Sequence, residues 1–339
     1  MRCIISPFVN PQRLTQSILY SHVRCQSRRR ASEAAGGSLN CKKIWELRMQ
    51  EFSGRTAVIT GGASGIGLGL AEHCAQLGMN VVLGDIQKDA LDQAVETVER
   101  RQADVIGVVT DTMMKSSVQN LLAEATAAFG NVHLVFNNAG VAAGNSAGKA
   151  VWEAPDDDWQ WVMGVNFYGV LYGVQTFIPH MLAHGEESYV VNTASLAAVM
   201  PMGGSYGVSK HGVLALTEGI QSDLEQRDAN VRAGVLCPGF VDTQIFAAER
   251  NRPGADQPHI DSDDPQFEIA KAMLANGKSP EEIAAYVFDA MAAEQFYMLP
   301  HPAWDEFVRS RTEQILARQG VATMDMMAML ERSAKGEQF

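Results

Sequence analysis

The chain has 339 residues, a formal net charge of −12 and a hydrophobic fraction of 46%, which is enough apolar side chain for a large core. The acidic balance disfavours binding to nucleic acid, and no apolar run approaches the ~20 residues that span a bilayer. The five cysteines include no C-x-x-C pair. Their spacing argues against a disulfide framework and against a metal site, and it suits a reducing compartment.

The first fifty residues differ from the rest of the chain in charge. They hold nine Lys or Arg and two Asp or Glu, a composition typical of a mitochondrial transit peptide. Pro7 and Pro11 nevertheless interrupt any amphipathic helix. We expect residues 1–50 to be disordered, as either an extension upstream of the true start or a targeting segment. The protein is accordingly expected in the cytoplasm, or in mitochondria if this segment is a transit peptide.

From residue 55 onward, short apolar runs alternate with longer amphipathic segments, a pattern typical of a parallel sheet covered by helices. Strands are predicted near residues 55–60, 80–84, 105–110, 132–136, 188–193, 231–236 and 295–299. Helices are predicted near residues 65–77, 88–101, 115–129, 156–184, 205–227, 280–293 and 303–318. We therefore expect one α/β domain over residues 51–304, with about seven strands and helices on both faces, followed by a C-terminal helical extension over residues 305–339.

A glycine-rich turn joins the first predicted strand to the first predicted helix. Gly61 permits a tight turn, Gly65 lets the backbone approach a pyrophosphate, and Gly67 allows close packing of the helix on the strand. The free N–H groups of the helix would then face the phosphates, and Ser64 and Ile66 lie between the glycines. This context predicts a Rossmann-type doubly wound sheet that binds a nucleotide, although a glycine turn without a ligand is the alternative.

Asp85 follows the second predicted strand, where an acidic side chain accepts hydrogen bonds from the hydroxyls of an adenosine ribose. Its carboxylate would repel the 2′-phosphate of NADP, and neither Ser64 nor Ile86 offers a cation to offset that repulsion. The sequence therefore favours NAD over NADP. A solvated aspartate at a strand end remains the alternative interpretation.

Tyr206 and Lys210 are four residues apart, which places both side chains on one face of a helix. A free tyrosine has a pKa near ~10, too high for a base at neutral pH. At ~5 Å and an effective dielectric of ~20, the lysine charge would lower that pKa by about two units. The pair is thus a candidate general acid/base, although this spacing alone is common on ordinary helices.

Taken together, these motifs resemble those of the classical short-chain dehydrogenase/reductase family, from about Phe52 to Trp304. The motifs that carry the resemblance occur in the family's order. They are residues 60–67, Asp111, residues 137–140, Asn166, Ser195, the Tyr206 and Lys210 pair, and Pro238-Gly239 followed by Thr243.

The resemblance implies a four-residue catalytic set. Tyr206 would be the base in alcohol oxidation and the acid in carbonyl reduction. Lys210 would lower the pKa of that phenol and bind the nicotinamide ribose. Ser195 would hold the substrate oxygen, and Asn166 would help to anchor a proton-relay water near the lysine.

The resemblance also implies further cofactor contacts from three segments. The turn of Asn138, Ala139 and Gly140 would support the cofactor. Asp111 would hydrogen-bond the adenine amino group. The segment of Pro238, Gly239 and Thr243 would hold the nicotinamide amide.

The serine departs from the family's spacing. Members of the family usually place it 13 residues before the tyrosine, whereas Ser195 is 11 before Tyr206, and strict spacing would select Thr193. Ser195 lies in a local context similar to the family's, and the following loop can absorb a two-residue deletion. We favour Ser195 and keep Thr193 as the alternative.

These features predict an NAD-dependent oxidoreductase that interconverts a secondary alcohol and a ketone. The residues expected to face the substrate are nearly all apolar, which favours a hydrophobic small molecule; they are Val141, Ala142, Leu196, Ala197, Phe240 and Phe246. By position, the irregular insert over residues 242–279 resembles the family's substrate lid. We expect a homo-oligomer, either a dimer or a tetramer. The alternatives are an NADP-dependent carbonyl reductase and a non-catalytic nucleotide-binding protein on the same fold.

Overall fold

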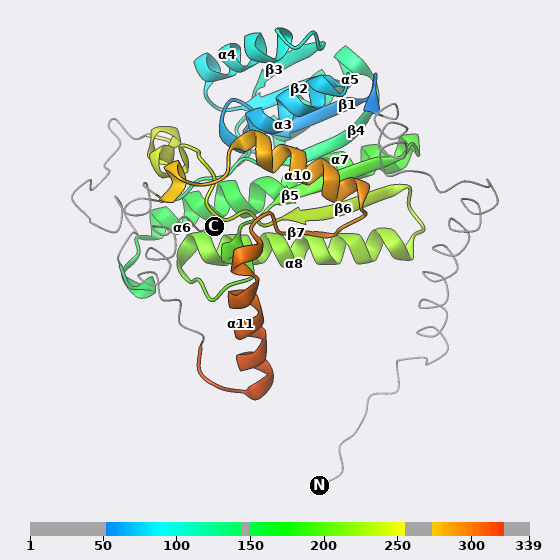
Figure 1. The fold of residues 1–339 in the computed structure, drawn as a ribbon. Coiled ribbons are helices and arrows are strands. Elements are labelled where there is room, and N and C mark those ends of the chain that lie inside the picture. The colour runs from blue at the N-terminus through cyan, green and yellow to red at the C-terminus, as the bar shows by residue number, and fades with distance from the viewer. Residues whose placement is uncertain (1–51, 144–148, 255–272, 322–339) are drawn as a thin grey trace, which may run out of the picture. The chain divides into compact units, whose positions relative to one another are not determined.

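A computed structural model of the protein describes residues 52–143, 149–254 and 273–321 (Figure 1). The predictions for residues 1–50, for the middle of the 242–279 insert and for residues 322–339 lie outside the described residues. Among the residues that are described, no helix has both the length and the apolar character needed to cross a membrane.

Seven parallel strands form one sheet in the order β3-β2-β1-β4-β5-β6-β7. The central strands are apolar and buried because helices cover both faces of the sheet. The predicted Rossmann-type doubly wound fold is confirmed. The strands are β1 (Thr56–Thr60), β2 (Asn80–Asp85), β3 (Val105–Val109), β4 (Val132–Asn137), β5 (Ser188–Thr193), β6 (Val231–Leu236) and β7 (Tyr297–Met298).

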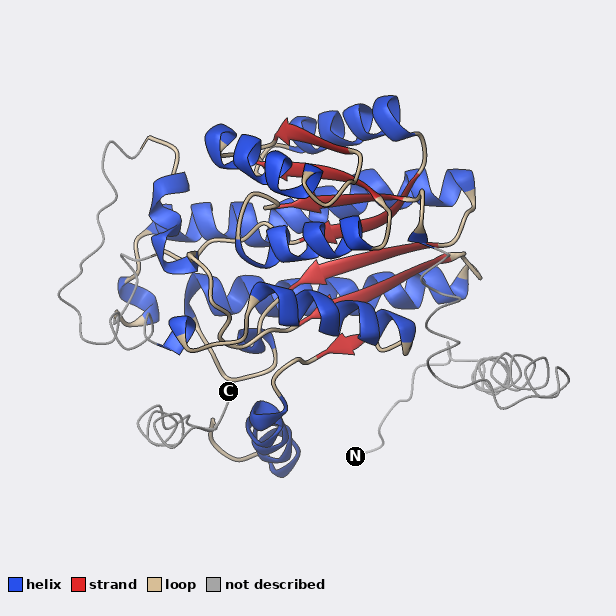
Figure 2. Cartoon of the chain, turned by 45° about the horizontal axis from the view of Figure 1, so that its top comes forward, coloured by secondary structure: helices blue, strands red, loops and turns tan. Residues whose placement is uncertain are grey.

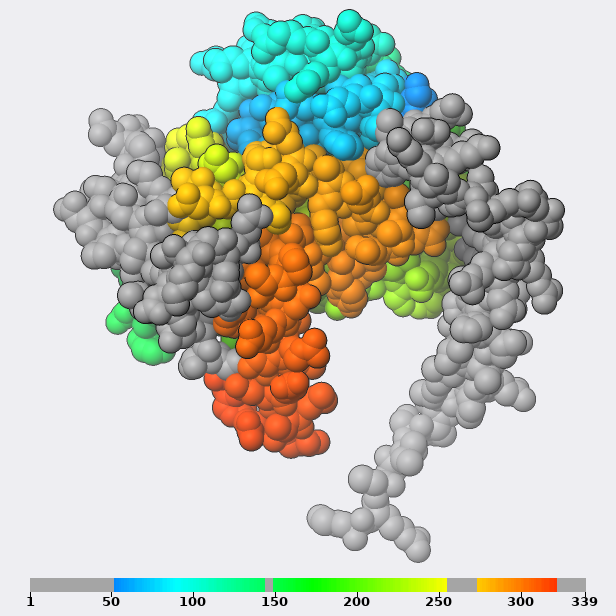
Figure 3. Space-filling view, in the orientation of Figure 1, coloured from blue at the N-terminus to red at the C-terminus, as the bar shows by residue number. Residues whose placement is uncertain are grey.

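Two layers of helices enclose this sheet (Figure 2). One layer is built around α3 and α10, which pack against each other, and the other contains α5, α7 and α8, whose apolar side chains meet the sheet in a buried cluster. The helices are α3 (Gly65–Gln76), α4 (Lys88–Glu99), α5 (Lys115–Phe129), α6 (Asp156–Met163), α7 (Gly169–His184), α8 (Gly204–Gln226), α10 (Pro280–Ala292) and α11 (Asp305–Ala317). The last of these, α11, has no buried residue and extends away from the body (Figure 3).

The connections place a crevice at the carboxyl edge of the sheet. From β1 the chain proceeds outward through β2 to β3, and it then returns to lay β4 on the other side of β1. Ligands of open α/β sheets bind where the strand order reverses in this way. The glycine turn after β1 and the polar residues after β2, β4 and β5 therefore lie along one edge.

Most element boundaries agree with the sequence prediction to within two or three residues, but the helix predicted over residues 156–184 is not regular. A π-helical segment, Gly164–Tyr168, separates α6 from α7. The glycine that begins this segment and the one that follows it pack closely on the β3–α5 connection, because a Cβ at Gly164 would meet Met113 at 2.6 Å and one at Gly169 would meet Thr112 at 3.0 Å. Asn166 lies within this segment, and π-helical turns are frequent at functional sites.

A row of buried polar side chains ties β4 and β5 to α8. Asn137 Nδ2 donates to Asn192 Oδ1 at 2.8 Å, and Asn192 Nδ2 donates to Thr217 Oγ1 at 3.0 Å. Gly173 of α7 packs directly on this row, since a Cβ there would lie 1.9 Å from Asn137 Oδ1. The row fixes the end of β4, from which the cofactor-side residues follow.

We expect Gly173→Ala to destabilise the protein by about 1–3 kcal/mol, because the new methyl group would displace the buried Asn137 amide. Gly219→Ala is the matched control: it is also on a helix, and a Cβ added there would have nothing within 4 Å. The control should gain up to about 1 kcal/mol from helix propensity. Chemical denaturation of both variants checks this, and equal stabilities would contradict the packing argument.

Candidate active site

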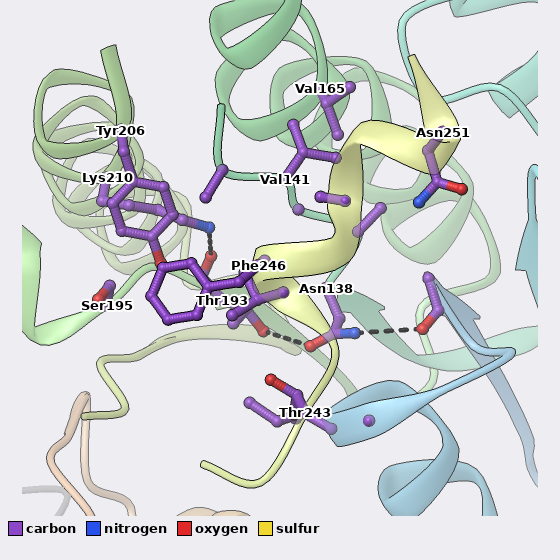
Figure 4. A pocket seen from close by; sticks show the side chains of 18 of the residues that line it. Asn138, Val141, Val165, Thr193, Ser195, Tyr206, Lys210, Thr243, Phe246 and Asn251 are labelled. Carbon is purple, nitrogen blue, oxygen red and sulfur yellow. Dashed lines mark hydrogen bonds between the residues drawn. The ribbon is translucent and has the colours of Figure 1, made fainter. Parts of the chain in front are cut away.

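A cavity of about 570 Å³ lies along the carboxyl edge of the sheet (Figure 4), within the roughly 300–1,000 Å³ usual for ligand and cofactor sites. Its wall includes all but two of the residues predicted for the site. The exceptions are Gly67 and Asn166, which lie behind the wall. The cavity therefore brings the predicted nucleotide and catalytic residues to one place.

The glycine turn adopts a backbone that other residues would not tolerate. Gly61 and Gly65 have φ angles of 65° and 52°, in the left-handed region that favours glycine. A Cβ at Gly67 would lie 2.0 Å from the carbonyl oxygen of Gly61, and one at Gly65 would lie 2.9 Å from Thr243. The glycines thus let the backbone at the start of α3 line the cavity, an arrangement that fits a pyrophosphate.

Asp85 is held at the end of β2 by two backbone donors. Its Oδ2 accepts from Ala63 N at 3.1 Å and its Oδ1 from Gln87 N at 3.0 Å. Our expectation that no cation lies near this carboxylate is wrong. Arg250, far away in the sequence, donates from Nε to Gln87 Oε1 at 3.3 Å and lines the same end of the cavity.

Asn138 joins the cofactor side of the cavity to its catalytic side. Its Nδ2 donates to the carbonyl of Thr60 at 3.3 Å. Its Oδ1 accepts from Thr193 Oγ1 at 3.2 Å (Figure 4). Thr60 Oγ1 in turn accepts from the backbone N–H groups of Asn138 and Ala139. These bonds hold β1, β4 and β5 in register at the site.

Asp111, which the sequence predicts to contact the adenine, is held by hydrogen bonds to residues that follow it closely in the chain. Asp111 Oδ1 accepts from Met113 N at 2.9 Å, and its backbone N–H donates to Ser117 Oγ at 3.0 Å. Asp111 lies in the cavity wall beyond β3. Its other carboxylate oxygen is thereby placed at the edge where the sequence predicts the adenine.

Tyr206 and Lys210 both face the cavity from the first turns of α8. Lys210 Nζ donates to the Thr193 carbonyl at 3.0 Å and lies 5.6 Å from the centroid of the Tyr206 ring. The Tyr206 hydroxyl is hydrogen-bonded to Ser195. The phenol, the ammonium group and the serine hydroxyl therefore meet in one corner.

Burial dominates the ionisation of this corner. It lowers the pKa of Lys210 to about 8. It also raises the pKa of Tyr206 above its usual value, and the hydrogen bond with Ser195 opposes only part of that rise. The predicted lowering of the tyrosine pKa by Lys210 is therefore not found. The attraction between the lysine charge and the phenolate was considered from the sequence without desolvation. Desolvation disfavours the charged form of each group.

Asn166 is completely buried and does not line the cavity. Its Oδ1 accepts from Val141 N at 2.8 Å, and its Nδ2 donates to the Val141 carbonyl at 2.9 Å and to Ser209 Oγ at 3.1 Å. The side chain thus fixes the loop after β4 onto α8, one residue from Lys210. Its amide is occupied by these bonds.

The geometry separates the two hydroxyls that compete for the substrate oxygen. Thr193 Oγ1 donates to Asn138, whereas Ser195 bonds the phenol of Tyr206 and accepts from Ala197 N at 3.2 Å. Ser195 is also partly exposed in the cavity, while Thr193 is buried. This arrangement favours the choice of Ser195 over strict sequence spacing.

His301 is a neighbour of the site that sequence reasoning missed. Its Nδ1 accepts from Gly239 N, and its Nε2 donates to the Phe240 carbonyl, both at 3.0 Å. Burial lowers the pKa of this histidine to about 4, so the neutral ring holds the Pro238–Phe240 segment. The sequence signal was its place just after the last strand, at the same edge as the other site residues.

The remaining wall is mostly apolar. It includes all six residues that were expected to face the substrate, and adds Trp161, Val165, Met200, Met202 and Trp304. Phe240 and Trp304 pack with ring centroids 5.8 Å apart and their planes tilted by 53°. The cavity thus has a polar floor and an apolar end.

Comparison with known proteins agrees with this geometry. The chain matches the family model for short chain dehydrogenases over residues 55–254. It is 32% identical to a CLA biosynthesis dehydrogenase/reductase of Lactiplantibacillus plantarum, over 79% of this chain and 95% of that protein. It is 36% identical to the 1-deoxy-11-beta-hydroxypentalenate dehydrogenase of Streptomyces avermitilis, over 72% of this chain and 83% of that protein.

Among solved structures, a short chain dehydrogenase/reductase from Burkholderia phymatum in complex with NAD is similar, with a TM-score of 0.75 and 41% identity. The match covers 81% of this chain and 99% of that one. Fold, cavity and relatives define an oxidoreductase that acts on CH–OH groups with NAD(P). The chain belongs to the classical short-chain dehydrogenase/reductase family.

The hydrogen bonds of the two hydroxyls lead to different expected phenotypes. Thr193→Val removes the bond to Asn138, so the melting temperature should fall while turnover decreases little. Ser195→Ala leaves that network intact but removes the hydroxyl beside the phenol, so kcat should fall by about tenfold or more. Thermal melts and steady-state kinetics on both variants check this, and the reverse ranking in kcat would assign the substrate oxygen to Thr193.

Proposed function

We propose that the protein is an NAD-dependent dehydrogenase that interconverts a hydrophobic secondary alcohol and its ketone. The observation that carries this proposal is the convergence of Tyr206, Lys210 and Ser195 in the cavity that also contains the glycine turn. A nucleotide-binding protein without catalytic function would not require these three groups to be held together.

The chain's own groups fit the dinucleotide along its whole length. The N–H groups of the α3 turn would bind the pyrophosphate, Asp85 the adenosine ribose and Asp111 the adenine. The segment of Pro238, Gly239 and Thr243 would bind the nicotinamide amide. Bound NAD supplies the hydride acceptor or donor, which is chemistry that no side chain provides.

The protein's part in the reaction is to position the alcohol and to move its proton. Ser195 would orient the substrate oxygen toward the phenol, and Tyr206 would take up the hydroxyl proton in oxidation or release it in reduction. Lys210, fixed by the Thr193 carbonyl, keeps further N–H donors for a ribose hydroxyl. Asn166 acts on this site through the Val141 loop and Ser209.

The substrate class follows from the apolar end of the cavity. Leu196, Met200, Phe240 and Trp304 form an apolar wall near Ser195, and burial of apolar surface there contributes about 25 cal/mol per Å². The Streptomyces relative, named for a hydroxypentalenate, also supports a bulky hydroxy compound as substrate. We therefore propose an alcohol or ketone on a large apolar skeleton.

Tyr206→Phe should reduce kcat by at least ~10²-fold while NAD still binds, because only the proton acceptor is lost. In the wild type, kcat/KM for oxidation should rise with pH below the raised pKa of Tyr206, since the phenolate fraction rises. Rates with a panel of apolar secondary alcohols check this, and near-normal turnover of the variant would refute the assignment.

Cofactor choice gives a second test. Asp85 can accept from a ribose 2′-hydroxyl and repels a 2′-phosphate, so kcat/KM should favour NAD over NADP by at least about tenfold, or roughly 1.4 kcal/mol. Asp85→Ala should narrow that ratio. Equal use of the two cofactors by the wild type would contradict the proposal.

A further inference from the structure

A short segment of the chain crosses the adenosine end of the cavity. We call residues 245–252 the strap; it consists of the helical turns Ile245–Asn251 and Arg252. Within the strap, Arg250 Nη1 donates to the carbonyls of Gln244 at 3.2 Å and Ala247 at 2.7 Å, and its Nε donates to Gln87 Oε1. Three bonds thus orient the guanidinium group toward the end of β2.

A second arginine fixes the other side of the strap. Arg252 bonds the buried carboxylates of Asp158, on α6, and of Glu249. Its guanidinium also lies 4.8 Å from the ring of Trp161. Because the strap is attached both to α6 and to the β2–α4 connection, Arg250 is held at this position rather than free to leave it.

Arg250 and Asp85 flank the same small region. Gln87 connects them, since its backbone N–H donates to Asp85 Oδ1 while its side-chain oxygen accepts from Arg250. The carboxylate of Asp85 also acts to raise the pKa of Arg250, against the burial that lowers it. An anion and a cation therefore both contact Gln87, at the end of the cavity where the adenosine ribose is expected.

We propose that Arg250 is a second determinant of cofactor specificity, which binds a phosphate on the 2′ position of the adenosine ribose. Nε and Nη1 of Arg250 are occupied by the bonds within the strap and to Gln87, which leaves Nη2 to donate to a phosphate oxygen. The carboxylate of Asp85 accepts from hydroxyls instead. Asp85 thus selects the 2′-hydroxyl of NAD, and Arg250 partly offsets the exclusion of NADP. The inference rests on the proposed function only in that the cavity binds a dinucleotide.

Binding measurements separate this role from a general contribution to the cofactor. Titration calorimetry gives the affinities for 5′-AMP and for adenosine 2′,5′-bisphosphate, and their difference is the contribution of the 2′-phosphate. The same comparison is made with the whole cofactors NAD and NADP. Arg250→Gln should weaken the binding of adenosine 2′,5′-bisphosphate and NADP by about tenfold. It should weaken the binding of 5′-AMP and NAD by less than about twofold. Arg100→Gln is the matched control, because Arg100 is exposed at the end of α4 and bonds Thr97. This control should leave the affinities for all four ligands unchanged.

The coupling between the two charges gives an independent test. Asp85→Asn should raise the affinity for NADP, because the carboxylate that repels the phosphate is lost. The gain should be several-fold larger with Arg250 present than in the Arg250→Gln background, because the arginine then attracts the phosphate without a competing anion. Equal weakening of all four ligands by Arg250→Gln would place the arginine on the adenosine 5′-phosphate that they share, and it would overturn the proposal. Unchanged affinities of the Arg250→Gln variant for adenosine 2′,5′-bisphosphate and NADP would also overturn the proposal. Failure of the wild type to bind NAD and 5′-AMP would instead refute the proposed function.

Discussion

The site depends on the hydrogen bonds of Asn138, which hold the ends of three strands together. Its side chain bonds backbone carbonyls of β1 and the hydroxyl of Thr193 on β5, while its own backbone follows β4. The residues proposed to bind the cofactor come from the β1 and β2 side, and those proposed for catalysis come from the β5 side. The junction contributes to setting the distance between the two halves, and hydride transfer requires reacting atoms about 3–3.5 Å apart.

The same junction explains why small residues surround it. A Cβ at Gly61 would lie 2.8 Å from Ala139 Cα, and one at Gly67 would contact Asn138 Nδ2 at 2.8 Å as well as the Gly61 carbonyl. The glycines of the turn therefore do more than approach a pyrophosphate. They allow β1 and the loop after β4 to come together, so that the nucleotide turn and the catalytic floor share one packing constraint.

Local patterns in the sequence were sufficient for the fold and for much of the cavity wall. The strands are short apolar runs, the turn is rich in glycine, and Tyr206 and Lys210 share a helix face whatever the tertiary structure. Arg250 could not be found in this way, because it meets Gln87 across 163 residues and only the path of the strap brings them together. His301 likewise reaches Gly239 across 62 residues.

The ionisation of the catalytic corner was mispredicted for a related reason. A spacing of four residues shows that two side chains are neighbours, but not that both are removed from water. Burial favours the neutral form of each, and it raises the pKa of Tyr206 while lowering that of Lys210 to about 8. A lysine that is itself so weakly basic contributes less as a fixed charge, and more as a donor held by the Thr193 carbonyl.

Gly140 supports that conclusion, because a Cβ there would lie 3.4 Å from Lys210 Nζ, and the glycine leaves the ammonium group open toward the cavity. With one N–H given to Thr193, the other donors of Lys210 face the region where a ribose and a substrate oxygen would lie. Within the described residues, the hydrogen bond with Ser195 opposes the rise that burial causes in the pKa of Tyr206. Formation of the phenolate, and with it proton transfer, therefore does not depend on the lysine charge alone.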